Sequence, residues 1–463
     1  MGLKIAGERV LVLGLGRSGR AATHLLLRFG ADKITVNDNK EPNLLQEEMG
    51  ELAAFSKVRV VAGAHRIELL EDISLIIKSP GINPRLPLLE EAKRRHIETI
   101  SEVELAYHFC PAPIAAVTGT NGKTTTVALT GEMFRLQFQR VLVAGNIGFP
   151  LCEAVLKAGG ADYMVAELSS FQLANVQDFR ARIAAVLNIS ADHLDYHGSM
   201  EEYIAAKRNI LLTQKSGDWS VLNWDDPLTR EMSSFVQGYL LPFSRHVSLS
   251  PGVFIKDGTI HVNDGRLDFP ICKAAEVRIP GDHNLENALA ATAVSWAAGV
   301  EQEKIASALR FFPGVPHRLE AVAVVQEIKF FNDSKGTNPE ATLKAIKALQ
   351  GPKLLIAGGL NKGSDFYPLA QSLNEEGVKA LILLGETAPI LADAAQAAGF
   401  KPVYKVSDLH SAVRQAFNLA QAGDTVLLSP ACASWDMFRD YEERGEVFRQ
   451  EIMALRESCA NEK

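Results

Sequence analysis

Cysteine is scarce in this sequence, which has only five in 463 residues, scattered and never arranged as a C-x-x-C pair. A disulfide framework needs a dense set of cysteines, and zinc sites usually draw on closely spaced pairs. Neither is therefore expected to organise the fold. The five positions are Cys110, Cys152, Cys272, Cys432 and Cys459.

The sequence also lacks any apolar run of the roughly 20 residues that a membrane-spanning helix requires. The short run VLVLGLG near the N-terminus has charged neighbours and no small-residue cleavage site after it, so no signal peptide is expected. The net charge is -7, so basic residues are not in excess. The overall charge of the protein would therefore not attract nucleic acid or an anionic membrane. These absences predict a cytoplasmic protein that binds neither nucleic acid nor membrane.

What the sequence does contain is an alternation of short apolar runs with helical stretches. Because the runs are continuously apolar, they predict strands of a parallel sheet covered by helices on both faces. Between residues 219 and 277 the pattern becomes turn-rich and predicts an antiparallel insertion. The predicted strands include ERVLVLGLG, DKITVND, SLIIKSPG, PIAAVTG, RVLVAGN, DYMVAELS, RIAAVLNIS, KLLIAGG, ALILLGE and DTVLLSP.

Two proline-containing segments divide the chain into three predicted α/β domains. Pro111 and Pro113 lead from the first α/β unit into the strand PIAAV, and FFPGVPHRLE (311–320) follows a long helical stretch. Such segments are typical of domain boundaries. The predicted domains are residues 1–101, 102–314 and 315–463.

The strand PIAAV is followed at once by GTNGKTTT, residues 119–126. This differs from the common phosphate-loop pattern G-x-x-x-x-G-K-[ST], which requires a glycine where Val117 stands. It keeps what a phosphate needs, namely small residues that let N–H groups converge, the ammonium of Lys123, and the hydroxyl of Thr124, which suits Mg²⁺. Its place between a buried strand and a helix predicts a nucleoside triphosphate site.

Two later strands of the same predicted domain end in possible metal ligands. Glu167 ends DYMVAEL, and Asp192 and His193 follow RIAAVLNIS. Ligands gather at the carboxyl ends of strands in open α/β sheets, so these groups could complete the coordination of Mg²⁺ beside a triphosphate. Taken singly, Glu167 could equally be a solvated loop acid and His193 a structural residue. Lys207 is one helix lysine among many and has no chemical feature that distinguishes it.

A second glycine-rich turn, GLGRSG at residues 14–19, matches the G-x-G-x-x-G pattern behind a strand and before a helix. Asp38 ends the next strand, where such an acid usually meets a ribose hydroxyl. The motif alone favours an NAD-dependent enzyme. Physically, the motif indicates only that a phosphate can bind the helix N-terminus, and a UDP-sugar fits that description as well as a dinucleotide does. A close-packed turn that binds no ligand is the other alternative.

Polar groups follow three apolar runs in the third predicted domain, IKFFNDSKGTNP, KLLIAGGLNKGSD and DTVLLSPACASWD. The carboxyl ends of parallel strands share one edge of a sheet, where cations and hydroxyls would suit an anionic small molecule such as a dicarboxylate. Ordinary turn chemistry is the alternative, since Asn, Asp, Ser and Gly favour turns. The residues placed at this edge are Asp333, Lys335, Thr337, Lys362 and Ser434.

Taken together, these segments resemble the motifs of the Mur ligase family over nearly the whole chain. The resemblance implies a Rossmann-like UDP-binding domain, a P-loop ATPase-like central domain with a mostly parallel sheet and a β-rich insertion, and a Rossmann-like C-terminal domain. Within the family, NDSKGTNP and LLSPACASWDMF resemble the member that adds D-glutamate. The matching segments are GTNGKTTT, GNIG, ELSSFQL, NISADHLDYH, AAKRNI, GDHNLENALAA, GVPHRLE and NDSKGTNP.

The resemblance implies an amide-forming reaction with two small-molecule substrates. ATP would phosphorylate the alanyl carboxylate of UDP-N-acetylmuramoyl-L-alanine, because a carboxylate resists attack by an amine until it carries a good leaving group. The amine of D-glutamate would then displace phosphate. Two Mg²⁺ ions, replaceable by Mn²⁺, would offset the charge of the triphosphate and carboxylate. The protein is expected to work as a monomer.

The resemblance also implies roles for single residues in catalysis and ATP binding. Thr124 and Glu167 would hold one Mg²⁺, and His193 would help to hold the second. Carbamylation of Lys207 would convert a cation that cannot bind Mg²⁺ into an anionic oxygen ligand. Catalytic roles would fall to Lys123, His193, Lys207 and Lys335. ATP would contact Gly119, Thr120, Asn121, Gly122, Lys123, Thr124, Thr125, Asn287, His317, Arg318, Asp333 and Lys335.

The remaining roles concern the two other substrates, and they follow from the same resemblance. Residues near the first turn would contact UDP, and residues after two strands of the central domain would contact the muramoyl-alanyl part. Residues of the third domain would contact D-glutamate. Tyr441 stands where the family is expected to have phenylalanine. The substrate-contacting residues would be Leu15, Arg17, Asp38, Asn39, Lys40, Gly81, Asn146, Ser169, His193, Thr337, Lys362, Ser434 and Tyr441.

Two other kinds of protein stay open at this stage. One is a sister amide ligase that adds a different amino acid or extends folate with glutamate. The other is an NAD-dependent dehydrogenase or a nucleotide-sensing protein that uses GLGRSG. Measuring phosphate release with each candidate amino acid would distinguish a sister ligase from the D-glutamate-adding one. Measuring NADH binding would distinguish a dehydrogenase or a nucleotide-sensing protein from a ligase.

Overall fold

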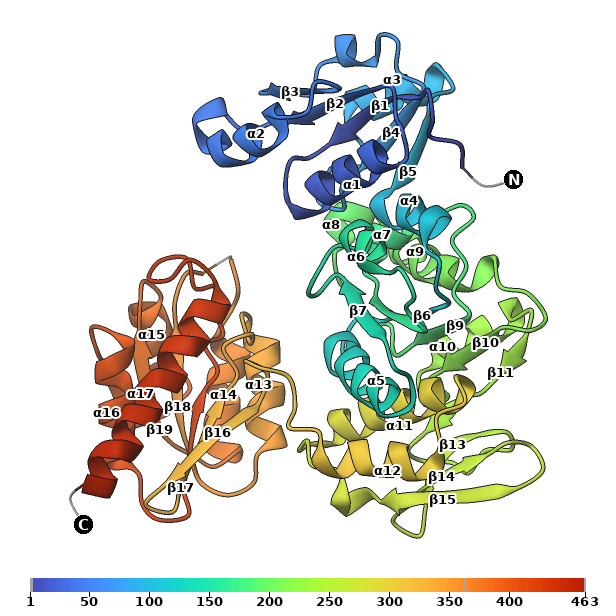
Figure 1. Cartoon of the computed structure of the whole chain (residues 1–463). Helices are drawn as coiled ribbons and strands as arrows, with labels where there is room; N and C mark the ends of the chain where they lie inside the picture. Colours follow the sequence, from blue (N-terminus) through green and yellow to red (C-terminus); the bar gives the residue numbers. More distant parts are fainter. Residues whose placement is uncertain (1–2, 362, 462–463) are drawn as a thin grey trace. The chain divides into compact units, whose positions relative to one another are not determined.

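The computed structural model describes residues 3–361 and 363–461 (Figure 1). The chain forms two compact units, one made of the residues up to Val277 with Leu285–Phe311, the other of Arg278–Asn284 with the residues from Phe312 onward. No helix within the described ranges is both long and apolar enough to cross a membrane. The boundaries of the three domains expected from the sequence stay predictions.

The first unit opens with a five-stranded sheet whose strands are all parallel. Its strands form because runs such as VLVL bury every side chain, as a sheet covered on both faces requires. The strand order is β3 (Val58–Ala62), β2 (Lys33–Asp38), β1 (Arg9–Leu13), β4 (Leu75–Lys78) and β5 (Glu98–Ser101). Its helical segments are α1 (Arg17–Arg28), η1 (Pro42–Leu44), α2 (Gln46–Ala53), η2 (Ile67–Leu70) and α3 (Pro87–Arg94).

A six-stranded parallel sheet follows in the same unit, after helix α4 (Glu102–Phe109). Its strands lie in the order β11 (Tyr239–Leu240), β10 (Trp219–Leu222), β9 (Ile183–Val186), β6 (Ile114–Thr118), β8 (Tyr163–Glu167) and β7 (Val141–Gly145). The helical segments are α5 (Lys123–Gln137), α6 (Leu151–Lys157), α7 (Ser170–Leu173), α8 (Leu194–His197), α9 (Met200–Leu212), α10 (Pro227–Glu231) and η3 (Met232–Phe235).

The β-rich insertion expected between residues 219 and 277 is confirmed as a four-stranded sheet. Three of its strands pair antiparallel, whereas its first short strand joins parallel, a departure from the all-antiparallel expectation. The strands are β12 (Phe243–Ser244), β13 (Gly252–Lys256), β14 (Thr259–Asn263) and β15 (Asp268–Lys273). Helical segments η4 (Ala274–Glu276), α11 (Asp282–Ala297) and α12 (Gln302–Phe311) follow.

The second unit is built on a six-stranded sheet with one antiparallel edge pair. Leu355 and Ala357 enter one hydrophobic core while Leu354 and Ile356 enter another, so KLLIAG is apolar throughout because both faces of the sheet are covered. The order is β16 (Glu320–Val325), β17 (Ile328–Asn332), β21 (Thr425–Leu428), β18 (Lys353–Gly358), β19 (Val378–Leu384) and β20 (Val403–Lys405). Its helices are α13 (Pro339–Ala348), α14 (Tyr367–Glu375), α15 (Ala388–Ala397), α16 (Leu409–Leu419) and α17 (Tyr441–Asn461).

Both units confirm the predicted fold class, an α/β fold with mostly parallel sheets. Strands β17, β21 and β18 are neighbours and run parallel, so their carboxyl ends share one edge, as expected for NDSKGTNP, SPACASW and GGLNKG. The first turn, GLGRSG, joins β1 to α1, and the phosphate-loop candidate joins β6 to α5. All three candidate regions therefore follow strands at their carboxyl ends.

Candidate active site

The loop between β6 and α5 ends at the start of a 15-residue helix. Gly122 caps this helix in a left-handed conformation, with φ +85°. A Cβ at this position would overlap the side-chain oxygen of Asn287, so both the backbone conformation and the close approach require glycine. The free N–H groups of a helix N-terminus favour an anion. The loop can therefore cradle phosphate oxygens.

Two lysine side chains meet at one carbonyl of this loop. Lys123 Nζ donates to Gly119 O and Thr120 O, both at 3.0 Å, and Lys207 Nζ donates to Gly119 O at 2.7 Å. Both amino groups thus lie where a triphosphate would bind. Thr124 and Thr125, in the first turn of the helix, are buried.

Lys207 differs from the other helix lysines in its burial, a difference that the sequence did not reveal. Its side chain is 1% exposed, and its Nζ lies 4.7 Å from the centroid of the Tyr203 ring. Burial, with the nearby charge of Lys123, lowers the pKa of Lys207 to about 6. A neutral amine is the form that adds CO₂ to give a carbamate, so carbamylation is chemically accessible here.

Glu167 has an oxygen that the described residues leave without a partner. The residue is 1% exposed; Oε1 accepts from Asn146 Nδ2 at 2.8 Å, whereas Oε2 is buried and makes no hydrogen bond within the described chain. Glu167 pairs in the sheet with Val117, which lies next to the phosphate loop. A buried carboxylate oxygen with no partner fits a metal ligand.

His193 occupies a strained position before α8. Its φ of +52° is left-handed, its Nε2 lies 3.4 Å from Asp192 Oδ2, and its ring lies 4.7 Å from that of Phe171. The side chain is 47% exposed, which leaves the imidazole accessible to a ligand. Non-glycine residues in this conformation often lie at functional sites.

The residues expected to bind UDP surround the turn between β1 and α1. Asp38 accepts from the backbone N–H of Leu15 at 2.8 Å and from that of Lys40 at 3.1 Å. The side chain of Leu15 is fully buried, so any ligand contact there uses its backbone. Arg17 donates to Gly148 O at 2.6 Å. Asn39, Lys40 and Gly81 are exposed.

Two residues expected to contact the muramoyl-alanyl part follow β7 and β8. Asn146, beyond β7, is tied to Glu167 by its side-chain amide. Ser169 caps α7, where its hydroxyl accepts from Gln172 N at 3.3 Å and donates to Gln172 Oε1 at 3.0 Å. The hydroxyl of Ser169 is thus engaged in a capping box.

In the second unit, Asp333 is held between two segments at the carboxyl edge of the sheet. Its Oδ2 accepts from Ser429 Oγ at 2.7 Å and its Oδ1 from Leu319 N at 3.2 Å. Burial raises the pKa of Asp333 to about 6, while Ser429 and the charge of Arg318 oppose the rise. The carboxyl group is therefore positioned by fixed donors.

Other residues expected in this unit lie around Tyr441. Lys335 Nζ is 5.4 Å from the centroid of the Tyr441 ring, and the His317 ring is 6.3 Å from it. His317 O also accepts from Lys335 N at 3.0 Å. Thr337 and Arg318 are half-buried and Ser434 is buried, whereas Lys362 lies outside the described residues.

Arg444 is a residue of this edge that nothing in the surrounding sequence distinguishes. The side chain is 2% exposed and links the two loops after β17 and β21, donating to Ser334 O at 2.8 Å and to Cys432 O at 3.2 Å. Burial lowers its pKa to about 10. In the sequence it is one arginine in a charged helix, and only the fold shows its partners.

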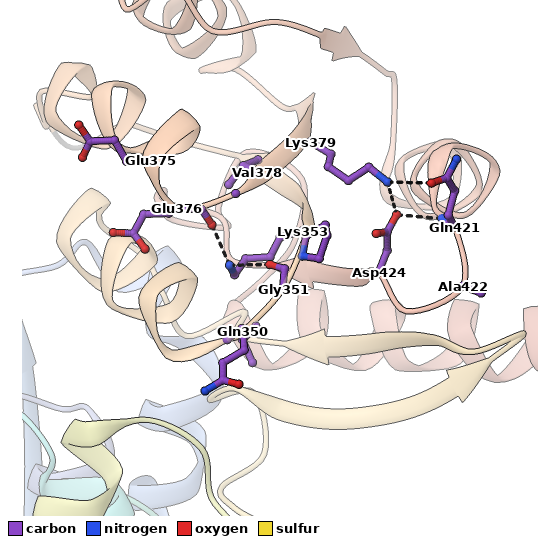
Figure 2. A pocket seen from close by; sticks show the side chains of 13 residues that line it. Gln350, Gly351, Lys353, Glu375, Glu376, Val378, Lys379, Gln421, Ala422 and Asp424 are labelled. Atoms are coloured by element: carbon purple, nitrogen blue, oxygen red, sulfur yellow. Dashed lines mark hydrogen bonds and ion pairs between the residues drawn. The ribbon is translucent and has the colours of Figure 1, made fainter.

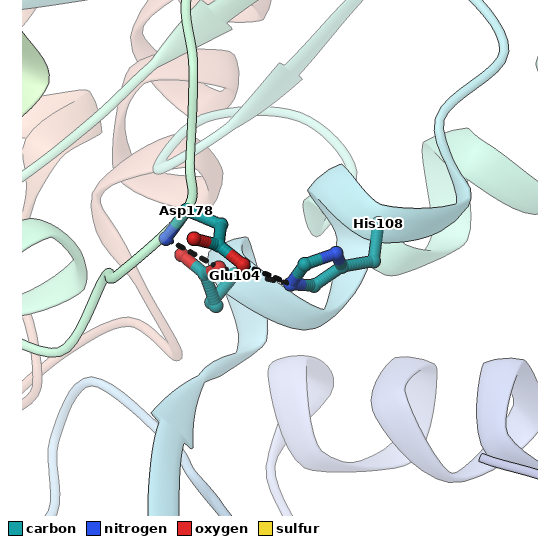
Figure 3. A group of neighbouring side chains, drawn as sticks. All are labelled: Glu104, His108 and Asp178. Carbon is teal, nitrogen blue, oxygen red and sulfur yellow. Dashed lines mark hydrogen bonds and ion pairs between the residues drawn. The ribbon is translucent and has the colours of Figure 1, made fainter. Parts of the chain in front are cut away.

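Two other features of the molecule carry no candidate catalytic role. Glu104, His108 and Asp178 cluster closely enough to suggest a metal site (Figure 3). The Glu104 carboxylate already accepts from three backbone N–H groups, those of residues 177, 178 and 179, and from His108. This arrangement holds a loop and leaves little for a metal.

The second feature is a hollow of about 870 Å³ in the second unit (Figure 2). It is lined by residues at the starts of β18, β19 and β21, the edge opposite the one that holds Asp333. There Lys353 donates to Gly351 O at 2.9 Å and to Glu376 O at 2.7 Å, while Lys379 pairs with Asp424 at 2.6 Å. Its lysines are thus engaged in holding helix ends and turns.

Profiles of known protein families match three successive parts of the chain. The Mur ligase MurD-like N-terminal domain matches residues 8–101, the Mur ligase middle domain residues 117–295, and the Mur ligase glutamate ligase domain residues 317–432.

Curated relatives match over nearly the full length. A protein of Caldanaerobacter subterraneus, named UDP-N-acetylmuramoylalanine--D-glutamate ligase, is 44% identical over 98% of this chain and 100% of its own. A protein of Geobacillus kaustophilus with the same name is 43% identical over 97% of this chain and 98% of its own.

Solved structures share the fold at low sequence identity. The UDP-N-acetylmuramate-alanine ligase of Thermotoga maritima has a TM-score of 0.58 at 18% identity and covers 96% of this chain and 99% of its own. The MurF ligase of the same organism, determined in complex with ADP, has a TM-score of 0.58 at 17% identity and covers 97% of this chain and 96% of its own.

Proposed function

The chain belongs to the Mur ligase family, and we propose that it is the ATP-dependent ligase that joins D-glutamate to UDP-N-acetylmuramoyl-L-alanine in peptidoglycan precursor synthesis. The observation that carries the proposal is 44% identity over 98% of the chain to a relative of that name. The phosphate loop with two lysines at Gly119 O supports its ATP-dependent part.

In the proposed first step, ATP transfers its γ-phosphoryl group to the alanyl carboxylate and ADP leaves. Residues Gly119–Thr125 cradle the triphosphate with backbone N–H groups, and the ammonium of Lys123 offsets negative charge as the phosphoryl group moves. Asn287, on α11, packs against Gly122 and is the proposed contact for adenine. The product of this step is an acyl phosphate.

The proposal includes two Mg²⁺ ions, which screen the charges of the triphosphate and the acceptor carboxylate when bound. Thr124 and Glu167 would hold one ion, and His193 with carbamylated Lys207 the other. The partnerless Oε2 of Glu167 supports the first set. The burial of Lys207 beside the phosphate loop supports the second, since a carbamate there would place anionic oxygens in a site that is otherwise cationic.

In the proposed second step, the amine of D-glutamate attacks the acyl phosphate and inorganic phosphate leaves. Thr337, Lys362 and Ser434 are the proposed contacts for the two carboxylates of D-glutamate, with Tyr441 beside them. His317, Arg318, Asp333 and Lys335 are the proposed ATP contacts of the C-terminal domain. The shared edge of β17, β21 and β18 supports this grouping.

The proposal also covers the substrate-binding first domain and the state of the protein. Leu15, Arg17, Asp38, Asn39, Lys40 and Gly81 would contact UDP, and Asn146, Ser169 and His193 the muramoyl-alanyl part. We propose that the enzyme acts as a monomer in the cytoplasm, where ATP and nucleotide-linked sugars are available. The cysteines described in the structure are all free, which agrees with a reducing compartment.

The experiment is a phosphate-release assay with ATP, Mg²⁺ and UDP-N-acetylmuramoyl-L-alanine, run with D-glutamate and, separately, with L-glutamate, L-alanine, L-lysine and meso-diaminopimelate. We expect release with D-glutamate alone. Equal or greater release with another amino acid, and none with D-glutamate, would replace the proposed function with that of a sister ligase. A reaction run with dihydropteroate and glutamate tests the folate-type alternative in the same way.

A further inference from the structure

Lys78 is a buried lysine that the proposed mechanism does not use. It ends β4, its side chain is 2% exposed, and its Nζ donates to Tyr196 Oη at 2.6 Å and to Ile82 O at 3.2 Å. Both acceptors are uncharged oxygens. Burying an ammonium group with such partners costs free energy, so a lysine here is poorly explained by stability alone.

Tyr196 completes a three-way hydrogen-bonded junction with this lysine. Its hydroxyl accepts from Lys78 and donates to Ile82 O at 3.3 Å, so the carbonyl of Ile82 is held by both side chains. Lys78 and Ile82 flank the turn that contains Gly81, a proposed UDP contact. The turn is itself closed by an N–H of Ile82 that donates to Ser79 O at 3.1 Å.

The junction lies next to the helix that follows His193. Tyr196 is in α8, three residues beyond His193, and its ring packs 4.4 Å from Phe171, which also contacts the His193 ring. A second contact joins the same two segments, since the guanidinium of Arg85 occupies the space where a Cβ on Gly198 would lie. The segment 78–85 and the segment 193–198 are thus packed together at two points.

From α8 the packing continues to the phosphate loop. His197 lies 5.0 Å from the Tyr196 ring and 5.3 Å from the Tyr203 ring. Tyr203 Oη is 2.9 Å from Thr120 Oγ1. Contiguous packed side chains therefore extend from the substrate turn to the ATP loop.

We propose that Lys78 and Tyr196 are a pair of positioning residues that fix the turn Ser79–Ile82 against helix α8, so that the UDP-linked substrate and the imidazole of His193 are placed by one junction. The inference rests on the proposed function for its consequence in catalysis. The junction itself consists of the hydrogen bonds already described and does not depend on that function.

The structural part is tested by amide hydrogen exchange of the full-length, unliganded protein. The variants are Lys78→Met, Tyr196→Phe and the double variant. Lys93→Met is the control, because Lys93 is an exposed lysine on α3, the next helix after the turn. We expect each single variant to speed exchange in both segments, 79–85 and 193–198, by about tenfold, the equivalent of one lost hydrogen bond to a charged group. Faster exchange in 79–85 alone for Lys78→Met, or in 193–198 alone for Tyr196→Phe, would overturn the pairing.

The catalytic part is tested by steady-state kinetics of the same variants. We expect the KM for UDP-N-acetylmuramoyl-L-alanine to rise about tenfold in each single variant and no further in the double variant, because either change breaks the same junction. The KM for D-glutamate should stay within about twofold of wild type. Multiplying effects in the double variant, or an unchanged KM for the UDP-linked substrate, would overturn the inference.

The two arms separate a failure of this inference from a failure of the proposed function. A wild-type protein without D-glutamate-dependent phosphate release would refute the function, and hydrogen exchange would still decide whether Lys78 and Tyr196 act together. An active wild type whose variants show no linked exchange would refute the pair alone.

Discussion

The two glycine-rich turns of the first unit share a backbone plan but differ in local charge. Each joins a buried parallel strand to the start of a helix, β1 to α1 and β6 to α5. At the first turn the carboxylate of Asp38 accepts from Leu15 N. At the second, the amino groups of Lys123 and Lys207 both donate to Gly119 O.

This difference teaches that the glycine pattern identifies a turn and the surrounding charges identify its ligand. A carboxylate at the first turn suits a ligand that offers hydroxyl or N–H donors and repels a bare triphosphate. The ammonium of Lys123 at the second suits a triphosphate. The G-x-G-x-x-G spelling alone favoured NAD, and its charge environment fits UDP equally well.

The largest expected effect comes from removing Lys207, which contacts the second turn from α9. Lys207→Ala should lower kcat by about 10²- to 10³-fold, the size expected when preorganised charge stabilisation is lost. Phosphate release measures it, with Lys215→Ala as an exposed control on the same stretch of chain. Acetate at high concentration should restore part of the activity if an anionic oxygen at this position was lost; full activity of Lys207→Ala would remove the residue from the site.

The next effect compares matched glycines of the two turns. Gly122→Ala must place a Cβ against Asn287 at φ +85°, and it should lower the free energy of unfolding by about 2 kcal/mol and weaken ADP binding. Gly16→Ala meets no atom within 4 Å and should cost less than about 1 kcal/mol. Chemical denaturation measures both, and equal costs would contradict the close approach described for the ATP loop.

A smaller effect is expected at the acid of the first turn. Asp38→Ala removes the acceptor for Leu15 N and should raise the KM for the UDP-linked substrate about 10- to 30-fold, as a lost hydrogen bond to a charged group predicts. The KM for ATP should hardly change. If the KM for ATP rose instead, the assignment of the two turns would be reversed.

The smallest effect concerns Asp333, the buried carboxyl group just after β17 in the second unit. Burial raises the pKa of Asp333 from 3.8 to about 6, so its protonated form stabilises the fold below pH 3.8 and that contribution is lost as the pH rises through 6. Asp333→Asn should remove this loss, so that its free energy of unfolding varies less than that of wild type by about 1 kcal/mol between pH 5.5 and 7.5. Urea unfolding measures it, with the exposed Asp393→Asn as control; identical pH profiles for wild type and Asp333→Asn would contradict the shift.

The sequence predicted the strands and their shared edges well, because a continuous apolar run has few other uses in a chain of this length. KLLIAG and TVLL are examples, since parallel pairing of these strands places the loops that follow them at one edge. The phosphate loop was predictable for the same reason. Its glycines and lysine are adjacent in the chain and follow a strand.

The rest of the site depends on contacts between residues far apart in the chain. Lys207 meets Gly119 across 88 positions, and Asn287 packs on Gly122 from a later helix. Arg444 and Lys78 are likewise defined by burial, which the sequence around them does not signal. Only the resemblance to the Mur ligase family points to Lys207. Nothing in the sequence points to Arg444 or Lys78.

The most direct test of the assignment of the two turns is equilibrium binding to the full-length protein. Titrations with UDP-N-acetylmuramoyl-L-alanine, ADP with Mg²⁺, and NADH would be run on wild type, Asp38→Ala and Lys123→Ala. We predict that Asp38→Ala weakens only the UDP-linked substrate, that Lys123→Ala weakens only ADP, and that NADH does not displace either. Displacement of the UDP-linked substrate by NADH, or the opposite pattern in the two variants, would contradict the account.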